Sequence, residues 1–298
     1  MRIASVIKLL VLATISIFLV SCGPTARFTY QQSDKVAPSI VDFQNDSKKA
    51  ESYTWDFGDG KTSSDENPNH KYYLSGKYEV ALTAKKGRKE KVTVQEIYVD
   101  APNICLLALE TDYGTIIMHL FDNTPKHRDN FIKLAEEGFF DGLLFHRVID
   151  GFMIQGGDPN SRDAKAGKPL GSGGPGYQIP AEFNKNNVHI RGAIAAARTS
   201  DSMNPQKKSS GSQFYIVHGK PLEESQLKNF ELMKGLQYTD EQKRIFLEEG
   251  GTPFLDMEYT VFGQVLEGFD VIEEIAQAKK DNRDRPIEDI KMQLNVIK

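Results

Sequence analysis

One guanidinium and one carboxamide lie within the otherwise mostly apolar run 145–158. The guanidinium belongs to Arg147 and the carboxamide to Gln155, and Phe152 and Met153 stand between them. An arginine held against an apolar surface needs a hydrogen-bond partner or a functional task. In a structural interpretation, the stem packs on a strand and the head reaches solvent. In a chemical interpretation, a fixed, charged donor beside an apolar pocket stabilises a polar state of a bound substrate without covalent chemistry.

Other chemistries find little support in the residue pattern. The six histidines are scattered and show no HExxH motif, and no serine, cysteine or carboxylate pair has nucleophile spacing. Cys105 has no second cysteine to pair with once Cys22 is assigned to processing below. The segment 167–176 contains GxGxxG spacing, but Pro175 interrupts it and no helix follows. The sequence therefore predicts neither a metal site nor a cofactor.

Length and charge set broad limits. The chain has 298 residues, which suggests one large domain or two ordinary ones. It is 39% hydrophobic and 26% charged, values typical of a globular protein with a packed core. The net charge of −4 and the absence of a basic cluster argue against nucleic-acid binding.

Short strands must position the arginine and the amide. Apolar, β-type segments recur at 105–110, 114–120, 145–149, 193–198 and 211–217. A helix is expected after Thr124, a good N-cap, with Pro125 at its first position and an end at Gly138. A second helix is expected over 269–278, since its apolar residues share one face. The second part of the chain is thus mostly β.

The run 145–158, FHRVIDGFMIQGGD, resembles the central motif of the cyclophilins, the cyclophilin-type peptidyl-prolyl cis-trans isomerases. The segments 193–198, 211–217, 254–256 and 259–263 resemble further parts of that family. The resemblance covers nearly all of residues 103–298. It implies an eight-stranded antiparallel β-barrel capped by two helices, which leaves few free sheet edges.

The resemblance also implies an active site. Arg147 and Gln155 are the expected catalytic residues, with Gln155 binding substrate and steadying Arg147. The expected substrate-binding residues line a proline pocket, its rim and an adjoining peptide groove: Phe152, Met153, Ala197, Arg198, Gln213, Tyr215, Phe254, Leu255 and Tyr259.

The chemistry of this family suits an arginine. Amide resonance opposes X–Pro rotation with a barrier of ~18–20 kcal/mol, and no covalent bond must break. In the twisted state the imide nitrogen has a localised lone pair that accepts a hydrogen bond. A donor that binds this state more strongly than the planar one speeds the rotation. The expected partners are proline-containing polypeptides.

Three positions depart from the best-known members of the family. Tyr215 stands where a phenylalanine is usual, which places a hydroxyl at the pocket. Phe254 replaces a tryptophan found in many members, and Tyr259 replaces a histidine. The loss of an indole donor implies weak binding of cyclosporin.

Residues 221–251 are an addition to the family pattern. The segment is charged and amphipathic, and Thr239-Asp240 has the form of a helix start, so a helical hairpin is expected. It is either a surface decoration or a wall of the active site that narrows which peptides enter.

Residues 27–100 form a separate β domain. Short alternating segments are separated by turn clusters, and Trp55 to Gly60 reads WDFGDG. This stretch resembles the PKD family, which implies a small immunoglobulin-like β-sandwich. Trp55 is interpreted as core rather than as a sugar-stacking platform. Asp56 and Asp59 are interpreted as turn caps rather than calcium ligands.

The first residues have the features of a targeting segment. Arg2 and Lys8 precede a short apolar run over 9–20 that is brief for a transmembrane helix. The following Ser21-Cys22-Gly23 resembles a bacterial lipobox, which implies a signal peptide over 1–21. Cys22 is then the lipidation site, and residues 22–35 are the lipidated cysteine and its tether. The expected location is the bacterial cell envelope, as a lipid-anchored periplasmic or outer-membrane protein.

Two classes of function remain in view. The first is a peptidyl-prolyl cis-trans isomerase that acts on exported polypeptides as a folding catalyst. The alternative is a non-catalytic surface lipoprotein that binds protein or carbohydrate. Because Arg147, Phe152, Met153 and Gln155 are all present, the sequence favours the enzyme.

Overall fold

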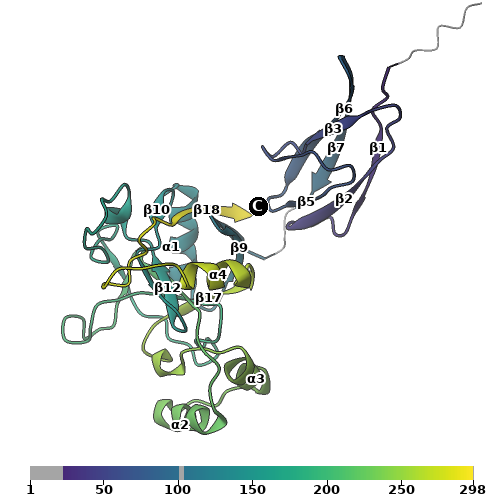
Figure 1. Ribbon diagram of the computed structural model, residues 1–298. Helices are drawn as coiled ribbons and strands as arrows, with labels where there is room; N and C mark the ends of the chain where they lie inside the picture. Colours follow the sequence, from purple (N-terminus) through teal and green to yellow (C-terminus); the bar gives the residue numbers. More distant parts are fainter. Residues whose placement is uncertain (1–22, 101–103, 298) are drawn as a thin grey trace, which may run out of the picture. The chain divides into compact units, whose positions relative to one another are not determined.

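The computed structural model describes residues 23–100 and 104–297 (Figure 1). These residues fold as two compact units whose main boundary falls between Tyr98 and Val99. The expected signal peptide and Cys22 lie outside the described residues, so both stay predictions. None of the helices that the structure describes is long and apolar enough to cross a membrane.

The first unit is a sandwich of two sheets. One sheet has the strand order β1-β2-β5 and the other the order β4-β3-β6-β7. Buried and exposed residues alternate along β2, as expected for a strand with one face in the core. The strands are β1 (Phe28–Gln32), β2 (Ser39–Asn45), β3 (Ser52–Asp56), β4 (Thr62–Ser63), β5 (Asn69–Tyr72), β6 (Gly76–Lys86) and β7 (Lys89–Val99).

Trp55 lies in the core of this sandwich. It is fully buried, and its ring lies 5.1 Å from that of Phe28 and 5.2 Å from that of Phe43. Its indole Nε1 donates a hydrogen bond to the carbonyl oxygen of Asp65 at 2.9 Å. The core interpretation is therefore confirmed, and this ring offers no exposed face for a sugar.

The two aspartates of the WDFGDG stretch cap turns. A carboxylate oxygen of Asp56 accepts from the backbone N–H of Gly58, and one of Asp59 accepts from that of Lys61, both at 3.0 Å. The second oxygen of Asp59 lies 2.7 Å from Nε2 of His70. Turn capping is confirmed for both residues.

The second unit contains a curled sheet with the strand order β10-β18-β8-β9-β17-β14-β16-β12-β11 (Figure 1). Neighbouring strands of this sheet are antiparallel. The strands are β8 (Leu106–Thr111), β9 (Gly114–Leu120), β10 (Leu143–Leu144), β11 (Arg147–Ile149), β12 (Met153–Gly156), β14 (Ala193–Ala196), β16 (Phe214–Val217), β17 (Val261–Glu267) and β18 (Lys291–Ile297). The mostly β fold is confirmed, and within the described residues this sheet has nine strands because the two-residue β10 pairs with β18.

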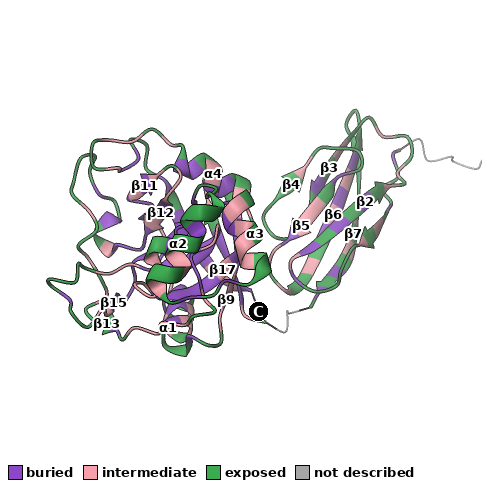
Figure 2. Ribbon diagram, turned by 90° about the horizontal axis from the view of Figure 1, so that it is seen from below, coloured by how far each residue is buried: buried purple, intermediate pink, exposed green. Residues whose placement is uncertain are grey.

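The helices fall into two groups. α1 (Pro125–Glu136) packs against β17 and β18, and α4 (Phe269–Ala276) packs against β9, β11 and β12. α2 (Glu224–Lys234) and α3 (Asp240–Glu248) form the expected hairpin of the insertion, and their outer faces are exposed (Figure 2). Smaller elements are the strands β13 (Gln178–Ile179) and β15 (Ser209–Ser210) and the 3-10 turns η1 (Pro159–Ser161) and η2 (Pro253–Leu255).

The start of α1 differs in one detail from the expectation. Thr124 occupies the N-cap position, but its hydroxyl donates to the carbonyl of Phe121 and does not cap the helix. The carboxylate of Glu182 accepts from the backbone N–H groups of Lys126 and His127 instead, at 3.1 and 3.0 Å. A distant acid thus satisfies the donors that the local threonine leaves unpaired.

Strand alternation gives the sheet two apolar faces. Val148, Ile154 and Ile216 belong to the main core, which also contains the buried faces of α1 and α4. The alternate residues form a second apolar cluster without helix residues, the pocket cluster: Met153, Ala193, Ala195, Tyr215, Val217 and Val261. The candidate site lies on this second face.

Candidate active site

Three neighbouring strands bring Arg147, Gln155 and Tyr215 into one row. Arg147 on β11 is opposite Gln155 on β12, and Gln155 is opposite Tyr215 on β16. The row continues to Ala195 on β14. Directly opposed residues of antiparallel strands point to the same face of a sheet, and so does Met153, two residues from Gln155. The sheet register therefore gathers a cation, an amide and an apolar floor at one place.

A cavity of about 170 Å³ opens at this place. It is smaller than the 300–1,000 Å³ that is typical of sites for drug-sized ligands, so it suits a small ring. Nine of the eleven residues expected in the site line it: Arg147, Phe152, Met153, Gln155, Ala197, Arg198, Tyr215, Leu255 and Tyr259. The tenth, Gln213, lines an adjoining cavity of about 510 Å³ together with Gln155, Ala197 and Arg198.

Phe254 is the expected residue that lines neither cavity. Its side chain is 46% exposed, and its ring stacks on that of Phe152 at 5.8 Å between centroids. Because Phe152 lines the smaller cavity, Phe254 reaches the pocket only through this stack. The two rings form an apolar rim beside the cavity.

Two arginines border the pocket, and they differ in their partners. Arg198 donates from Nε to the backbone carbonyl of Glu258 at 2.8 Å and forms an ion pair with Asp201 at 2.5 Å. Its guanidinium also lies 4.5 Å from the centroid of the Tyr259 ring. The side chain of the half-buried Arg147 has no hydrogen-bond or ion-pair partner in the parts of the chain that the structure describes. Arg147 is thus the arginine whose donors remain available to a substrate.

Gln155 is fixed toward the groove rather than toward Arg147. Its Nε2 donates to Oε1 of Gln213 at 3.2 Å. Gln213 in turn donates from Nε2 to the carbonyls of Gly171 and Gly173, at 3.0 and 2.7 Å. The expected steadying of Arg147 by Gln155 therefore stays a prediction, while the amide chain ties Gln155 to the glycine-rich loop.

The hydroxyl of Tyr215 does not enter the pocket as a free group. It lies 3.0 Å from Nε2 of His189, and both residues are buried. Burial raises the pKa of Tyr215 well above its ordinary value, and the nearby Tyr259 and Asp256 add to this rise. The phenol stays protonated, so the pocket presents the ring of Tyr215 as an apolar surface.

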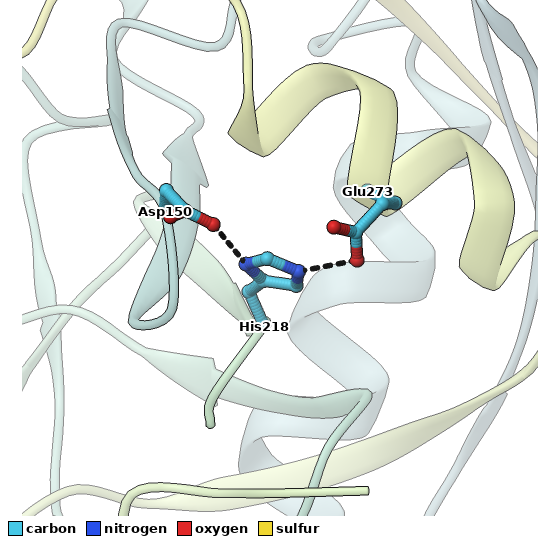
Figure 3. A group of neighbouring side chains, drawn as sticks. All are labelled: Asp150, His218 and Glu273. Carbon is cyan, nitrogen blue, oxygen red and sulfur yellow. Dashed lines mark hydrogen bonds and ion pairs between the residues drawn. The ribbon is translucent and has the colours of Figure 1, made fainter. Parts of the chain in front are cut away.

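A group of possible metal ligands lies outside the pocket, at Asp150, His218 and Glu273 (Figure 3). Nδ1 of His218 accepts from the backbone N–H of Gly151 at 2.9 Å, so its Nε2–H donates to Glu273 at 2.7 Å. Arg191 donates to the same carboxylate at 2.9 Å. These bonds from His218 and Arg191 lower the pKa of Glu273 to about 2. His218 and Glu273 are thus joined by hydrogen bonds to Gly151 and Arg191, while Oδ1 of Asp150 lies 3.6 Å from Nδ1 of His218.

This network supports the turn that carries Phe152. The carbonyl of Phe152 accepts from the backbone N–H groups of His218 and Gly219, at 3.0 and 3.1 Å. Together with the bond from Gly151 to His218, these contacts hold the turn between β11 and β12 against the end of β16.

His146 directly precedes Arg147, the first residue of β11, and the two residues line a cavity of about 270 Å³ together with Gln155. His146 is 4% exposed, and neither ring nitrogen has a hydrogen-bond partner among the described residues. Burial lowers the pKa of His146 to about 4, against the opposing effects of Asp158 and the backbone of Leu144, and the charges of Arg147 and Arg285 add to the lowering. The ring is therefore neutral near pH 7.

Sequence reasoning missed two residues behind the pocket, His189 and Asp256. Both are buried, and Nδ1 of His189 lies 2.6 Å from Oδ1 of Asp256. They are 67 residues apart in the chain, and no local motif joins them. The replacement of phenylalanine by Tyr215 was the available signal, because a buried hydroxyl requires a partner.

Comparisons with known proteins agree with this geometry. Residues 106–296 match the family model described as "Cyclophilin type peptidyl-prolyl cis-trans isomerase/CLD", and residues 23–100 match that described as "PKD domain". Two similar proteins carry the name peptidyl-prolyl cis-trans isomerase. The one from Staphylococcus haemolyticus is 36% identical over 188 residues, which are 62% of this chain and 86% of that protein. The one from Staphylococcus saprophyticus is 37% identical over 188 residues, which are 62% of this chain and 87% of that protein.

Among solved structures, a cyclophilin type peptidyl-prolyl cis-trans isomerase of Cryptosporidium parvum aligns with a TM-score of 0.47 and 22% identity. The alignment covers 65% of this chain and 98% of that one. A second structure of that protein, in the presence of the dipeptide Ala-Pro, aligns with a TM-score of 0.45 and 23% identity over 64% and 97% of the two chains.

The fold and the site define a mostly β protein with an arginine at the edge of a small apolar pocket. With the family model matched over most of its length, the chain belongs to the cyclophilin-type peptidyl-prolyl cis-trans isomerase family, and it carries a PKD domain at its N-terminal side.

Proposed function

We propose that this protein accelerates X–Pro rotation in exported polypeptides, with Arg147 as the donor that stabilises the twisted imide. One observation carries the mechanism: the guanidinium of Arg147 has no hydrogen-bond or ion-pair partner among the described residues, and Arg147 lines a small cavity with Phe152, Met153 and Leu255. The aromatic and aliphatic side chains hold the proline ring and exclude water. A charged hydrogen bond is stronger in such surroundings than in water.

The catalytic effect depends on a difference between two states of the substrate. The planar imide nitrogen is a poor acceptor because its lone pair is delocalised, whereas the twisted nitrogen accepts. The fork of Arg147 can bind the substrate carbonyl in both states and the nitrogen only in the second. Gln155, fixed by Gln213, is placed to bind the peptide backbone beside the ring.

The test measures isomerisation of short X–Pro peptides by exchange NMR. Removal of one donor aimed at a transition state typically costs about 10²- to 10³-fold in rate, and Arg147→Ala should lose that much in kcat. Arg147→Lys keeps the charge but not the fork, and it should retain part of the rate. Arg88→Ala, at an exposed position of the first unit, is the matched control and should turn over substrate at the wild-type rate.

A full rate in Arg147→Ala would refute the mechanism. An inactive wild-type protein that still binds proline peptides would instead show that the pocket serves only for binding.

The location in the envelope is a second part of the proposal, and the sequence around Cys22 supports it. Acyl chains on this residue would hold the enzyme at a bilayer, each buried methylene contributing about 0.8 kcal/mol. In bacterial cells, Cys22→Ser should move the protein from the membrane fraction to the soluble fraction. Unchanged membrane attachment of this variant would show that Cys22 is not the anchor.

A further inference from the structure

A buried chain of hydrogen bonds connects the insertion to the proline pocket. Tyr238, between α2 and α3, donates its hydroxyl to Oδ2 of Asp256 at 2.7 Å. Oδ1 of Asp256 accepts from the backbone N–H and Nδ1 of His189, at 2.8 and 2.6 Å. Nε2 of His189 meets the hydroxyl of Tyr215 at 3.0 Å. All four side chains are at most 4% exposed.

The donors and acceptors of this chain have one consistent assignment. The carboxylate of Asp256 can only accept, so Nδ1 of His189 carries the proton and Nε2 accepts from Tyr215. Burial is the first cause that raises the pKa of Tyr238 and of Tyr215, so both phenols keep their protons. Every link is therefore occupied, and none of the four groups acts as a nucleophile or a base.

The insertion does not line the pocket, contrary to one of the two interpretations drawn from the sequence. No lining residue of the 170 Å³ cavity belongs to residues 221–251. The insertion has its own apolar cluster, in which Leu227, Leu236 and Phe246 pack on Val188. The exposed Met233 is not part of this cluster. The insertion thus stands behind the pocket rather than across its entrance.

The insertion makes a second contact with the segment that contains Asp256. Lys234, at the end of α2, forms an ion pair with Glu258 at 3.4 Å. The backbone carbonyl of Glu258 accepts from Nε of Arg198, which lines the pocket. Both contacts of the insertion therefore reach residues 256–258, which lie between the pocket residues Leu255 and Tyr259.

We propose that the insertion positions the proline pocket, and that Tyr238, Asp256 and His189 are positioning residues that act on substrate through Tyr215. The chain of bonds fixes the ring of Tyr215 from behind, where a phenylalanine would have packing alone. Tyr238 thereby adjusts how tightly a proline ring is held, while the donor on Arg147 is unaffected. This inference rests on the proposed function, since it concerns the same pocket.

The test is a double-mutant cycle on Tyr238→Phe and Tyr215→Phe, read as KM and kcat for X–Pro peptides well below the unfolding temperature. Tyr238→Phe removes one hydroxyl and should raise KM about three- to tenfold with kcat changed less than twofold. In the Tyr215→Phe background the same substitution should change KM less than twofold, because the link is already cut. The control is Tyr98→Phe, which removes a hydroxyl bonded to Glu96 in the first unit and should change neither parameter.

Two results would overturn the inference: an unchanged KM in Tyr238→Phe, or an equal effect of Tyr238→Phe in both backgrounds. If Tyr238 had a purely structural role, Tyr238→Phe would lower the unfolding temperature, and its effect on KM would be the same in the wild-type and Tyr215→Phe backgrounds. If Tyr238→Phe does not fold, the nitrogen NMR signals of the His189 ring answer the question. Saturation of the wild-type pocket with a proline peptide should shift the Nε2 signal, and an unmoved signal would equally overturn the inference. Failure of the proposed function is seen separately, as a full rate in Arg147→Ala.

Discussion

Acid should destabilise the isomerase domain in a way that depends on His146. The pKa of this histidine falls from an ordinary 6.5 to about 4 in the folded protein. Between these two values the unfolded chain binds a proton that the folded chain does not, so stability is lost as pH falls. Each pKa unit corresponds to about 1.4 kcal/mol, which gives a loss of about 2.5 kcal/mol at pH 4.5 and about 3.4 kcal/mol well below pH 4.

His146→Leu removes the titrating group and both nitrogens that lack partners. Replacement of an unpaired buried polar group by an apolar one of similar size is often neutral or stabilising, so stability at pH 7 should change by less than about 1 kcal/mol. The difference in the free energy of unfolding between pH 7 and pH 4.5 should shrink by about 2.5 kcal/mol relative to wild type. The buried His127, whose pKa is also lowered by burial, leaves a remaining acid dependence of the same sign in both proteins.

Urea unfolding, monitored by hydrogen exchange of residues 104–297, measures the free energy of unfolding at each pH. Trp55 is the single tryptophan and is buried in the first unit, so its fluorescence reports the unfolding of that unit. The Trp55 transition should be the same in wild type and His146→Leu at each pH, and it serves as the internal control. Equal acid dependence of residues 104–297 in the two proteins would refute the assignment of a depressed pKa to His146.

Three further outcomes are expected. Phe254→Trp supplies an indole donor at the rim and should tighten cyclosporin binding by about 1 kcal/mol in calorimetry, and equal affinities would contradict the role given to the missing donor. Gly157→Ala forces an alanine into a left-handed conformation (φ +86°) and against a backbone carbonyl, so it should cost more than about 2 kcal/mol in denaturant unfolding. Gly167→Ala, with a similar φ of +75° and open space, should cost about 1 kcal/mol, and equal costs would argue against the steric cause. Glu273→Gln removes a carboxylate with a pKa of about 2, so it should abolish the part of the stability that wild type loses between pH 4.5 and pH 2, and a full wild-type loss in the variant would contradict that pKa.

Local patterns were enough to predict the elements that carry the site. The apolar, β-type segments 114–120, 145–149 and 211–217 contain the strands β9, β11 and β16. The hairpin of the insertion followed from its amphipathic pattern, and Thr239 caps α3 as expected, with its hydroxyl accepting from the N–H of Gln242. These features depend on neighbours in sequence, which is why a single sequence discloses them.

Partners far apart in the chain could not be predicted in this way. The cap of α1 comes from Glu182, 56 residues from Lys126, and the partner of Gln155 is Gln213, 58 residues away. The bond between His189 and Asp256 likewise joins residues that are 67 positions apart. Such pairs are set by tertiary geometry, and no periodicity or motif marks them.

The division of the sheet into a main core and a pocket cluster has an evolutionary consequence. Substitutions at Met153 or Tyr215 alter a cluster that shares no members with the one enclosed by α1 and α4. Substrate preference can therefore drift among descendants of this chain while the main core of the domain stays untouched. Laboratory libraries confined to the pocket cluster should accordingly contain a high share of soluble, well-folded members with altered preference for the residue that precedes proline.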